Sequence, residues 1–433
     1  MAAVARFLAR ASVGGAGAFG VAVYAASPTD DAGQRSTALG LARVDGAVRP
    51  MLAAVLPAEA FVCLYSATRT PFIHALSTSA VQSSLDSSAR VRAMGLTFRN
   101  DLGNAAGLDK DGSLLDFNYA IGAGFTVVGT VLSDGHTGNI FNFLGGMWKG
   151  NAWTPLPLSG GALNSLGLPS KGIDAALESI AAFRKRHDMP PQCAERRGAS
   201  SLKVAPTSPA FPIGVSIMGH PAHDAAKKLE GVLECVRRAI PLADFLEINE
   251  SCPNVHHGGG SSAAATQELR ARLQAIVSVR DQLAKEKGGR RVPILVKLGD
   301  LGDTKETVRF LSKIGIDGVI GLNTQKDYAN FELPPADRAL LEHYTDRHGG
   351  GLSGPPIRER AMGQAAAAQA AADELRLKGS FTVIHVGGLQ SAEDMQRSRG
   401  HGIELRQWYT GLMHGLAQPE PHSLYARVTA TAK

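Results

Sequence analysis

Amide, hydroxyl and thiol groups are concentrated in residues 249 to 254, which read Asn-Glu-Ser-Cys-Pro-Asn and follow the apolar run ADFLEI. The apolar run predicts a buried strand, so this polar cluster lies at a strand end. A thiol can act as a base once neighbouring dipoles and cations polarise it. An amide can bind a polar ligand because it offers both a donor and an acceptor. The cluster could therefore be a turn or an active site, and an isolated cysteine such as Cys252 is more often a small buried hydrophobe.

The elements that must hold this cluster alternate along the chain from residue 92 onward. Strand-like apolar runs occur at 124–131, 211–218, 243–249, 292–298, 317–323, 380–388 and 403–411. Helical stretches separate them, which predicts a parallel sheet of the α/β class. This number of units favours a closed (β/α)8 TIM barrel over an open doubly wound sheet. Segment 184–210 is rich in proline, serine and charge, and we expect a surface insertion there.

Polar side chains collect where these strands end, which is where barrels of this kind place their chemistry. They are Thr130, Ser216, Asn249, Lys297, Asn323, Thr324, Tyr409 and Thr410. A lysine such as Lys297 at the end of an apolar strand costs several kcal/mol unless an anion pairs with it. Together with the amides on neighbouring strands, it indicates a polar ligand.

Two glycine-rich segments, 349–356 and 385–391, narrow the class of ligand. Each can present backbone N–H groups to a phosphate, although either alone is equally typical of a tight turn. Both fall late in the barrel, where phosphate sites occur, so together they favour a phosphorylated cofactor such as FMN. The GxGxxG pattern that follows the first strand of a Rossmann domain is missing, which disfavours bound nicotinamide or FAD.

Composition sets the broad class. The chain has 433 residues, 44% hydrophobic and 19% charged, which is enough apolar material for a large core. The net charge of +6 is spread along the sequence without a Lys/Arg block, so nucleic-acid binding is not expected. The four cysteines lack the spacing of metal ligands, so we expect no metal site.

Residues 1–43 have the features of a mitochondrial presequence, because Arg6 and Arg10 occur before any acidic residue. The uncharged stretch 12–26 is glycine- and alanine-rich and shorter than the roughly 20 residues of a membrane-spanning helix, so an anchor and a cleaved segment both stay open. Residues 44–84 carry apolar side chains at helical spacing, and we expect Pro57 and Pro71 to divide them into short helices. These helices either cap the barrel, residues 85–433, or rest on a membrane surface.

Eight motifs together resemble the dihydroorotate dehydrogenase family. They are NAAGLDKDG (104–112), NSLGLPS (164–170), NESCPN (249–254), VKL (296–298), LNT (322–324), GGLSG (350–354), VGGL (386–389) and WYTG (408–411). They occur in the family's order, and the resemblance spans roughly residues 44–425. It implies oxidation of dihydroorotate to orotate, a step of pyrimidine biosynthesis, with FMN as the cofactor.

The resemblance also implies a role for each matching residue. FMN would be contacted by Ala106, Gly107, Leu108, Asp109, Lys110, Thr130, Ser216, Asn249, Lys297, Leu322, Gly354, Gly388, Tyr409 and Thr410. Dihydroorotate or orotate would be contacted by Lys110, Asn164, Ser165, Leu166, Gly167, Leu168, Asn249, Asn254, Asn323 and Thr324. Cys252 would remove the C5 proton, and Lys297 would stabilise the anionic reduced flavin.

The motifs combine two branches of the family. The leader, the short helices and Tyr409 resemble the membrane-associated, quinone-reducing branch, whereas Cys252 and Ser216 resemble the soluble branch. Segment 141–146 shows no counterpart of the quinone-site arginine. A leader and an apolar helical pair suit a lipid-soluble oxidant, so we expect ubiquinone as the acceptor and the mitochondrial inner membrane as the location.

Three alternatives stay open. The same reaction could use a soluble acceptor such as fumarate. The chain could be a different FMN barrel, such as a dihydropyrimidine or dihydrouridine oxidoreductase. It could also be a degenerate, membrane-associated barrel that serves as a scaffold. The joint presence of six residues disfavours this interpretation: Lys110, Asn164, Asn249, Cys252, Lys297 and Asn323.

Overall fold

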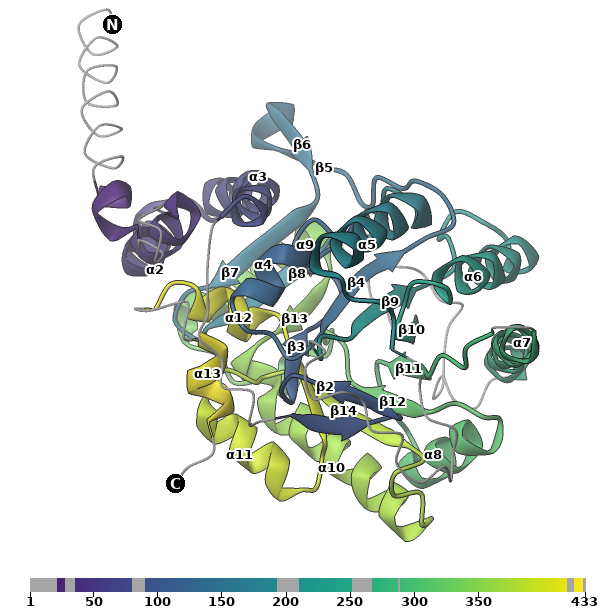
Figure 1. Ribbon diagram of the computed structural model, residues 1–433. Coiled ribbons are helices and arrows are strands. Elements are labelled where there is room, and N and C mark those ends of the chain that lie inside the picture. Colours follow the sequence, from purple (N-terminus) through teal and green to yellow (C-terminus); the bar gives the residue numbers. More distant parts are fainter. Residues whose placement is uncertain are drawn as a thin grey trace, which may run out of the picture.

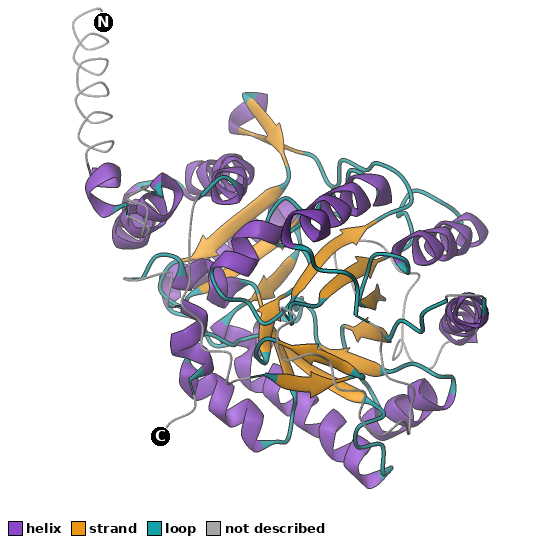
Figure 2. Cartoon of the chain, viewed as in Figure 1, coloured by secondary structure: helices purple, strands orange, loops and turns teal. Residues whose placement is uncertain are grey.

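Eight parallel strands form the centre of the computed structural model, in the order β3, β15, β14, β12, β11, β10, β9 and β4. A parallel bridge between Gly103 and Phe125 brings the two edge strands together. Helices surround the resulting, nearly closed barrel (Figures 1 and 2). The predicted TIM-barrel class is therefore confirmed. The structure describes residues 22–27, 36–79, 90–192, 210–250, 267–286, 289–418 and 424–430.

The barrel strands are short and buried along their whole length. Their bounds are β3 (Leu102–Asn104), β4 (Thr126–Val131), β9 (Ile213–Ile217), β10 (Phe245–Asn249), β11 (Ile294–Leu298), β12 (Gly318–Gly321), β14 (Thr382–Val386) and β15 (Leu405–Trp408). Each of the seven predicted runs contains one of these strands. The prediction missed β3, whose three residues are too few to show a hydrophobic period.

Helices follow the strands and cover the outside of the barrel. They are α4 (Leu115–Ala120), α5 (Ile173–His187), α6 (Ala225–Ala239), α7 (Gln267–Lys285), α8 (Thr304–Lys313), α9 (Pro335–His348), α10 (Arg358–Glu374), α11 (Ala392–Gly400), α12 (Thr410–Gly415) and α13 (Leu424–Thr429). The insertion predicted at 184–210 begins too early, because α5 continues to His187 and its Arg184 forms a buried ion pair with Asp244. Residues 193–209 lie outside the described part.

Smaller sheets cover the two ends of the barrel. The hairpin β1 (Val91–Ala93) and β2 (Leu96–Phe98) precedes the barrel, and its Phe98 packs against Phe125 and Phe245 inside it. A second antiparallel sheet consists of β7 (Ala152–Leu156), β8 (Gly161–Ser165) and β13 (Gly351–Ser353). A further hairpin, β5 (Phe141–Phe143) and β6 (Trp148–Gly150), is joined by the short turn η2 (Leu144–Gly146).

The amino ends of three strands are fixed by buried ion pairs. An aspartate stands directly before β3, β10 and β12, and an arginine buried against it donates to its carboxylate at 2.7–2.9 Å. The pairs are Asp101 with Arg406, Asp244 with Arg184, and Asp317 with Arg280. Charges at this end hold the strands in place, which leaves the carboxyl ends for ligands.

Two helices, α2 (Thr37–Val55) and α3 (Ala58–Ser77), pack beside the barrel on the face next to β7 (Figure 1). Helix α2 begins at Thr37, where the Ser36 hydroxyl caps it by accepting from Leu39 N–H, so it runs across the predicted boundary at residue 43. The predicted break at Pro71 is wrong, since α3 continues through it. Buried residues before and after Pro71, such as Tyr65 and Leu76, hold both halves against the protein.

Within the described ranges, none of the helices combines the length and the apolar character that crossing a membrane requires. Most of stretch 12–26 lies outside those ranges.

Candidate active site

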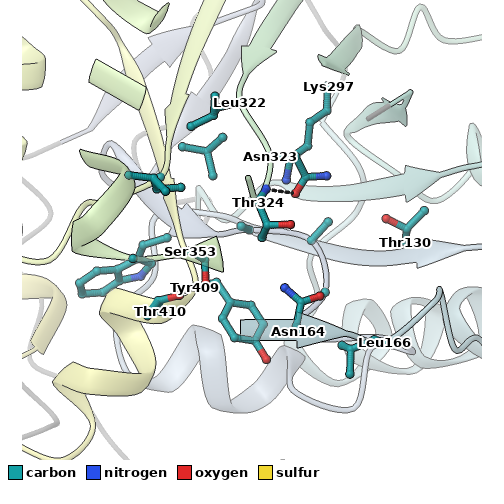
Figure 3. Close-up of a pocket in the computed structure, with 18 of the residues that line it drawn as sticks. Thr130, Asn164, Leu166, Lys297, Leu322, Asn323, Thr324, Ser353, Tyr409 and Thr410 are labelled. Carbon is teal, nitrogen blue, oxygen red and sulfur yellow. Dashed lines mark hydrogen bonds between the residues drawn. The ribbon is translucent and has the colours of Figure 1, made fainter. Parts of the chain in front are cut away.

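A pocket opens at the carboxyl ends of the barrel strands, where β8 and β13 also contribute to its wall. Seventeen of the predicted site residues line it: Ala106, Gly107, Lys110, Thr130, Asn164, Leu166, Gly167, Leu168, Asn249, Lys297, Leu322, Asn323, Thr324, Gly354, Gly388, Tyr409 and Thr410. Figure 3 shows the labelled side chains entering it from different elements. The residues predicted to bind cofactor and those predicted to bind substrate therefore share one pocket.

Lys297 and Asn249 are side by side because β10 and β11 pair in parallel with these two residues in register. The Lys297 side chain is only 4% exposed and reaches the pocket from the end of β11. No described carboxylate lies within ion-pair distance of its ammonium group. A buried cation that has no carboxylate partner among the described residues is a suitable partner for a ligand that carries or develops negative charge.

A chain of hydrogen bonds fixes Asn249 from inside the barrel. Its Nδ2 donates to Thr130 Oγ1 at 2.9 Å, and Thr130 Oγ1 lies 3.0 Å from Ser216 Oγ. Ser216 Oγ donates to the fully buried Glu247 at 3.0 Å, and Gln407 Nε2 donates to the other carboxylate oxygen at 3.3 Å. This network orients the Asn249 amide before any ligand binds.

The segment 164–168, predicted to bind substrate, continues from β8 along the pocket. Asn164 Nδ2 contacts Gly351 O of β13 at 3.5 Å, and Leu166 O accepts from Asn139 N–H at 2.9 Å. Gly167 and Leu168 both have positive φ, 68° and 61°, so the chain turns sharply around the pocket here. Because neighbouring segments hold this turn at several points, its amide and apolar side chains are presented in a fixed arrangement.

Three glycines that were predicted to contact the cofactor line another part of the pocket wall. Gly107 has φ of 104°, and a Cβ added there would meet nothing within 4 Å, so a side chain would project into open pocket space. At Gly388 a Cβ would lie 2.3 Å from Arg358 Cα, so the backbone of the second glycine segment packs closely on α10. A Cβ added at Gly354 would lie 3.0 Å from Gly160 O. The open space at Gly107 leaves room for a ligand such as FMN, whereas Gly388 and Gly354 allow the segments of the pocket wall to pack closely on one another.

Four predicted contact residues lie behind the pocket wall rather than in it. Leu108 is in the hydrophobic core, and Ser165 is buried beside Asn139. Ser216 reaches the pocket only through Thr130. Asp109 is fully buried, and burial raises the pKa of its carboxyl to about 7, against the opposing effect of the backbone N–H groups of Leu114, Gly112 and Asp111. These residues position the wall that the ligand touches.

Two predicted residues, Cys252 and Asn254, lie outside the described residues. Their roles stay predictions. The described chain reaches Glu250, whose N–H donates to Lys297 O at 3.0 Å and whose carboxylate pairs with Arg272 of α7. The segment therefore leaves the barrel next to Lys297.

Sequence reasoning missed an arginine at the edge of the pocket. Arg69 of α3 donates to Tyr409 Oη at 2.8 and 3.1 Å and to Gly107 O at 3.2 Å. The only signal in the sequence is a cation within an otherwise apolar helical stretch. Its partner Tyr409 lies 340 residues away, so the contact depends on how α3 docks.

Arg69 also lines a second cavity of about 540 Å³ between the α2–α3 pair and the barrel. The wall of this cavity is mainly apolar and includes Val48, Leu52, Leu64, Phe72 and Met413. Trp153 and Thr410 line both cavities, so the two are neighbours across a thin wall. Among the described residues, no cluster of side chains has the composition of a metal site.

Comparisons with known proteins agree with this geometry. A dihydroorotate dehydrogenase from Alkalilimnicola ehrlichii, of the quinone type, is 30% identical over 332 residues, which cover 75% of this chain and 81% of that protein. A quinone-type dihydroorotate dehydrogenase from Burkholderia thailandensis is 31% identical over 327 residues, covering 74% and 79%. The crystal structure of the Eimeria tenella enzyme with ferulenol superimposes with a TM-score of 0.65 at 22% identity, covering 84% and 89%.

The family model that matches is described as dihydroorotate dehydrogenase and aligns with residues 88–420. That range contains all eight strands of the barrel and every predicted site residue. With the pocket, the fold and this match in agreement, the chain belongs to the dihydroorotate dehydrogenase family.

Proposed function

We propose that the protein oxidises dihydroorotate to orotate with FMN in the strand-end pocket and passes the electrons to a quinone bound in the second cavity. The observation that carries this proposal is the pair of adjoining cavities: a polar one with Lys297 and the asparagines, and an apolar one lined by α2 and α3. FMN, when bound, supplies the acceptor for the hydride that leaves C6 of the substrate.

The residues of this chain bind the substrate, stabilise the charge on the cofactor and remove the proton. Asn164, Asn249 and Asn323 bind the amide and carboxylate edges of the pyrimidine, since each side chain has both a donor and an acceptor. Lys297 places a buried positive charge where negative charge develops on the cofactor during the transfer. Cys252, which immediately precedes Pro253 in the segment leaving β10, takes the C5 proton.

Support for quinone as the acceptor comes from the second cavity and from the quinone-type relatives. A mainly apolar cavity of this size suits a lipid-soluble ring, whose burial against apolar side chains is favourable. Localisation at the mitochondrial inner membrane is a proposal that rests on the N-terminal sequence alone.

An acceptor comparison tests the proposal. The full chain, loaded with FMN, is given dihydroorotate and either a short-chain ubiquinone, fumarate or NAD. We expect flavin absorbance to bleach with dihydroorotate and turnover to be fastest with the quinone. Bleaching that is followed by faster turnover with fumarate would reject the acceptor but keep the first half of the reaction.

Replacing the proposed base tests the other half. Cys252→Ala should bind FMN and orotate normally and reduce the flavin at least about a hundredfold more slowly, as expected for loss of general base catalysis. Cys252→Ser should retain part of the rate, with its optimum at higher pH because a hydroxyl is a weaker acid than a thiol. Near-normal reduction by the alanine variant would reject the role.

A further inference from the structure

The exposed large hydrophobic side chains of the described residues are confined to the first 158 positions of the chain. They are Tyr24, Met51, Val55, Leu64, Ile140, Leu144, Met147 and Leu158. The described helices that cover the rest of the barrel, α5 to α13, contribute none. An uneven distribution of this kind marks an interaction surface rather than scattered surface residues.

The most exposed of these side chains are at the tip of the β5–β6 hairpin. Met147 is 86% exposed and Leu144 is 40% exposed, and between them Gly145 and Gly146 have φ of 69° and 92°. Two glycines with positive φ allow a tight turn that holds both apolar side chains at the end of the hairpin. Figure 1 shows this hairpin projecting beyond the barrel beside α3.

The hairpin is anchored firmly at its base. Phe143 is 1% exposed and packs against Trp148, with ring centroids 5.0 Å apart, and both belong to the hydrophobic cluster that includes Phe61 of α3. Leu144 N–H donates to Glu59 Oε1 in the first turn of α3 at 2.9 Å. The tip is therefore held next to the first turn of α3, which follows the exposed Met51 and Val55 of α2 along the chain.

We propose that the tip of the β5–β6 hairpin, residues 144–147, inserts into a lipid surface together with the C-terminal end of α2. The barrel thus supplies a second membrane contact beside the helical pair. The proposal rests on the proposed function in one respect, namely that the apolar cavity exchanges its occupant with lipid.

Three features favour lipid over a protein partner. The tip is narrow and convex, so it can enter a bilayer surface but offers little area to a folded partner. The next two residues are Trp148, partly buried, and Lys149, exposed, which is the pairing found at the level of lipid headgroups. Leu64 of α3 is both 39% exposed and part of the wall of the second cavity, so this wall includes an apolar side chain that is open to the surroundings.

Vesicle flotation tests the proposal with the full chain and phosphatidylcholine vesicles that contain a minority of anionic phospholipid. The variant Leu144→Asp/Met147→Asp should lower the partition coefficient on the order of tenfold, because two apolar contacts become charged. The control Ala367→Asp/Ala370→Asp adds the same charge at exposed positions of α10, on the far side of the barrel in Figure 1. The control should bind vesicles like the unmodified chain.

Flavin reduction by dihydroorotate in solution is measured for both variants and should be unchanged. This readout separates the two proposals, since a failure of flavin reduction in the unmodified chain would reject the proposed function without affecting the binding result. Equal partitioning of the hairpin variant and the unmodified chain would overturn the membrane contact. The proposal would also be overturned if the unmodified chain had the mass of a dimer in solution and the hairpin variant had the mass of a monomer. That result would assign the tip to self-association.

Fluorescence gives an independent test of insertion. Trp153 and Trp408 are 9% and 2% exposed, so quenching by lipids brominated on their acyl chains should act mainly on Trp148. Trp148→Phe should abolish most of the quenching while the protein still binds vesicles. Quenching that persists in this variant, or that is missing when the unmodified chain is bound, would overturn the proposal.

Discussion

At the scale of single residues, the site depends on polar groups that never touch the ligand. Glu247 is fully buried two residues before Asn249 on β10, and its carboxylate accepts hydrogen bonds from Ser216 and Gln407. Ser216 joins this carboxylate to Thr130, which in turn accepts from Asn249. The orientation of a pocket amide is therefore determined from beneath the pocket.

Removing the middle of this network should affect both stability and binding. Ser216→Ala leaves Glu247 with one donor fewer, so we expect a loss of about 1–3 kcal/mol in the free energy of unfolding. Orotate affinity should also fall, because Thr130 and Asn249 lose their fixed orientation. Urea unfolding and orotate titration of the flavin spectrum measure the two effects.

Thr154→Val is the matched control. Thr154 is fully buried outside the site, and its hydroxyl contacts only Pro155 O at 3.5 Å in the described structure. Orotate affinity should be unchanged in this variant. Equal affinity in Ser216→Ala would show that the network has no part in binding.

Arg69 is the second residue whose effect can be measured separately. Its guanidinium group contacts Tyr409 and Gly107 at the wall between the two cavities. Arg69→Met should slow flavin reoxidation by quinone roughly tenfold and raise the quinone KM, since one charge-assisted hydrogen bond near the acceptor is lost. Reduction of the flavin by dihydroorotate should change little.

Tyr409→Phe removes only the hydroxyl that accepts from Arg69 and should give a smaller effect in the same direction. Stopped-flow measurements give the rates of flavin reduction and of flavin reoxidation separately for each variant. A variant Arg69→Met that is slow in reduction and normal in reoxidation would contradict the assignment.

At the scale of elements, α2 and α3 form one side of a cavity as well as a cover for the barrel. Val48 of α2 is partly buried and lines the apolar cavity, whereas Ala47 on the same helix is exposed and does not. Substitutions at Val48 and Ala47 therefore test directly whether quinone binds in this cavity.

Val48→Trp should fill part of the cavity and raise the quinone KM by at least about tenfold, because an indole takes the volume that the acceptor ring needs. Turnover with a water-soluble dye that accepts electrons from the flavin should be retained. Ala47→Trp should behave like the unmodified chain with both acceptors. The same KM for quinone in both variants would place the quinone site elsewhere.

Comparison of these elements with the sequence shows what a pattern can predict. The seven longer barrel strands were predicted because runs of buried residues separated by helices identify them. The strand-end positions of Asn249 and Lys297 followed from the same runs. The three-residue strand β3, the continuation of α3 through Pro71 and the contact of Arg69 with Tyr409 were missed, because each depends on packing between distant segments.

At the scale of the whole molecule, the two ends of the barrel have different physical properties. The amino ends of β3, β10 and β12 carry the buried aspartate–arginine pairs, and the carboxyl ends carry the pocket. His385 of β14 is fully buried between these ends, with its Nδ1 3.1 Å from Ser398 Oγ. Burial, with a smaller effect of Arg406, lowers the pKa of His385 to about 3.

This pKa makes stability depend on pH in a defined direction. Between pH 6.5 and 3 the unfolded chain binds a proton at His385 that the folded chain does not, so stability falls as pH decreases through this window. From pH 6.5 to pH 5 the contribution of His385 should fall by about 2 kcal/mol. His385→Gln should reduce the difference in unfolding free energy between pH 7.5 and pH 5 by that amount.

Ser398→Ala serves as the comparison for this variant. It removes the hydroxyl partner but keeps the imidazole, so it should lower stability at both pH values and leave their difference nearly unchanged. Urea unfolding at the two pH values measures both variants. An unchanged pH difference in His385→Gln would show that the buried imidazole does not account for acid sensitivity.

Trp153 and Thr410 belong to the walls of both cavities, so the proposed function gives the pyrimidine and the quinone separate cavities on the two sides of a shared wall. The pyrimidine and the oxidant then do not compete for one binding site. Initial rates plotted in double-reciprocal form against one reactant, at several levels of the other, should give parallel lines. Orotate should compete with dihydroorotate and not with the oxidant. A substitution that blocks one of the two cavities should slow only the half-reaction that takes place there.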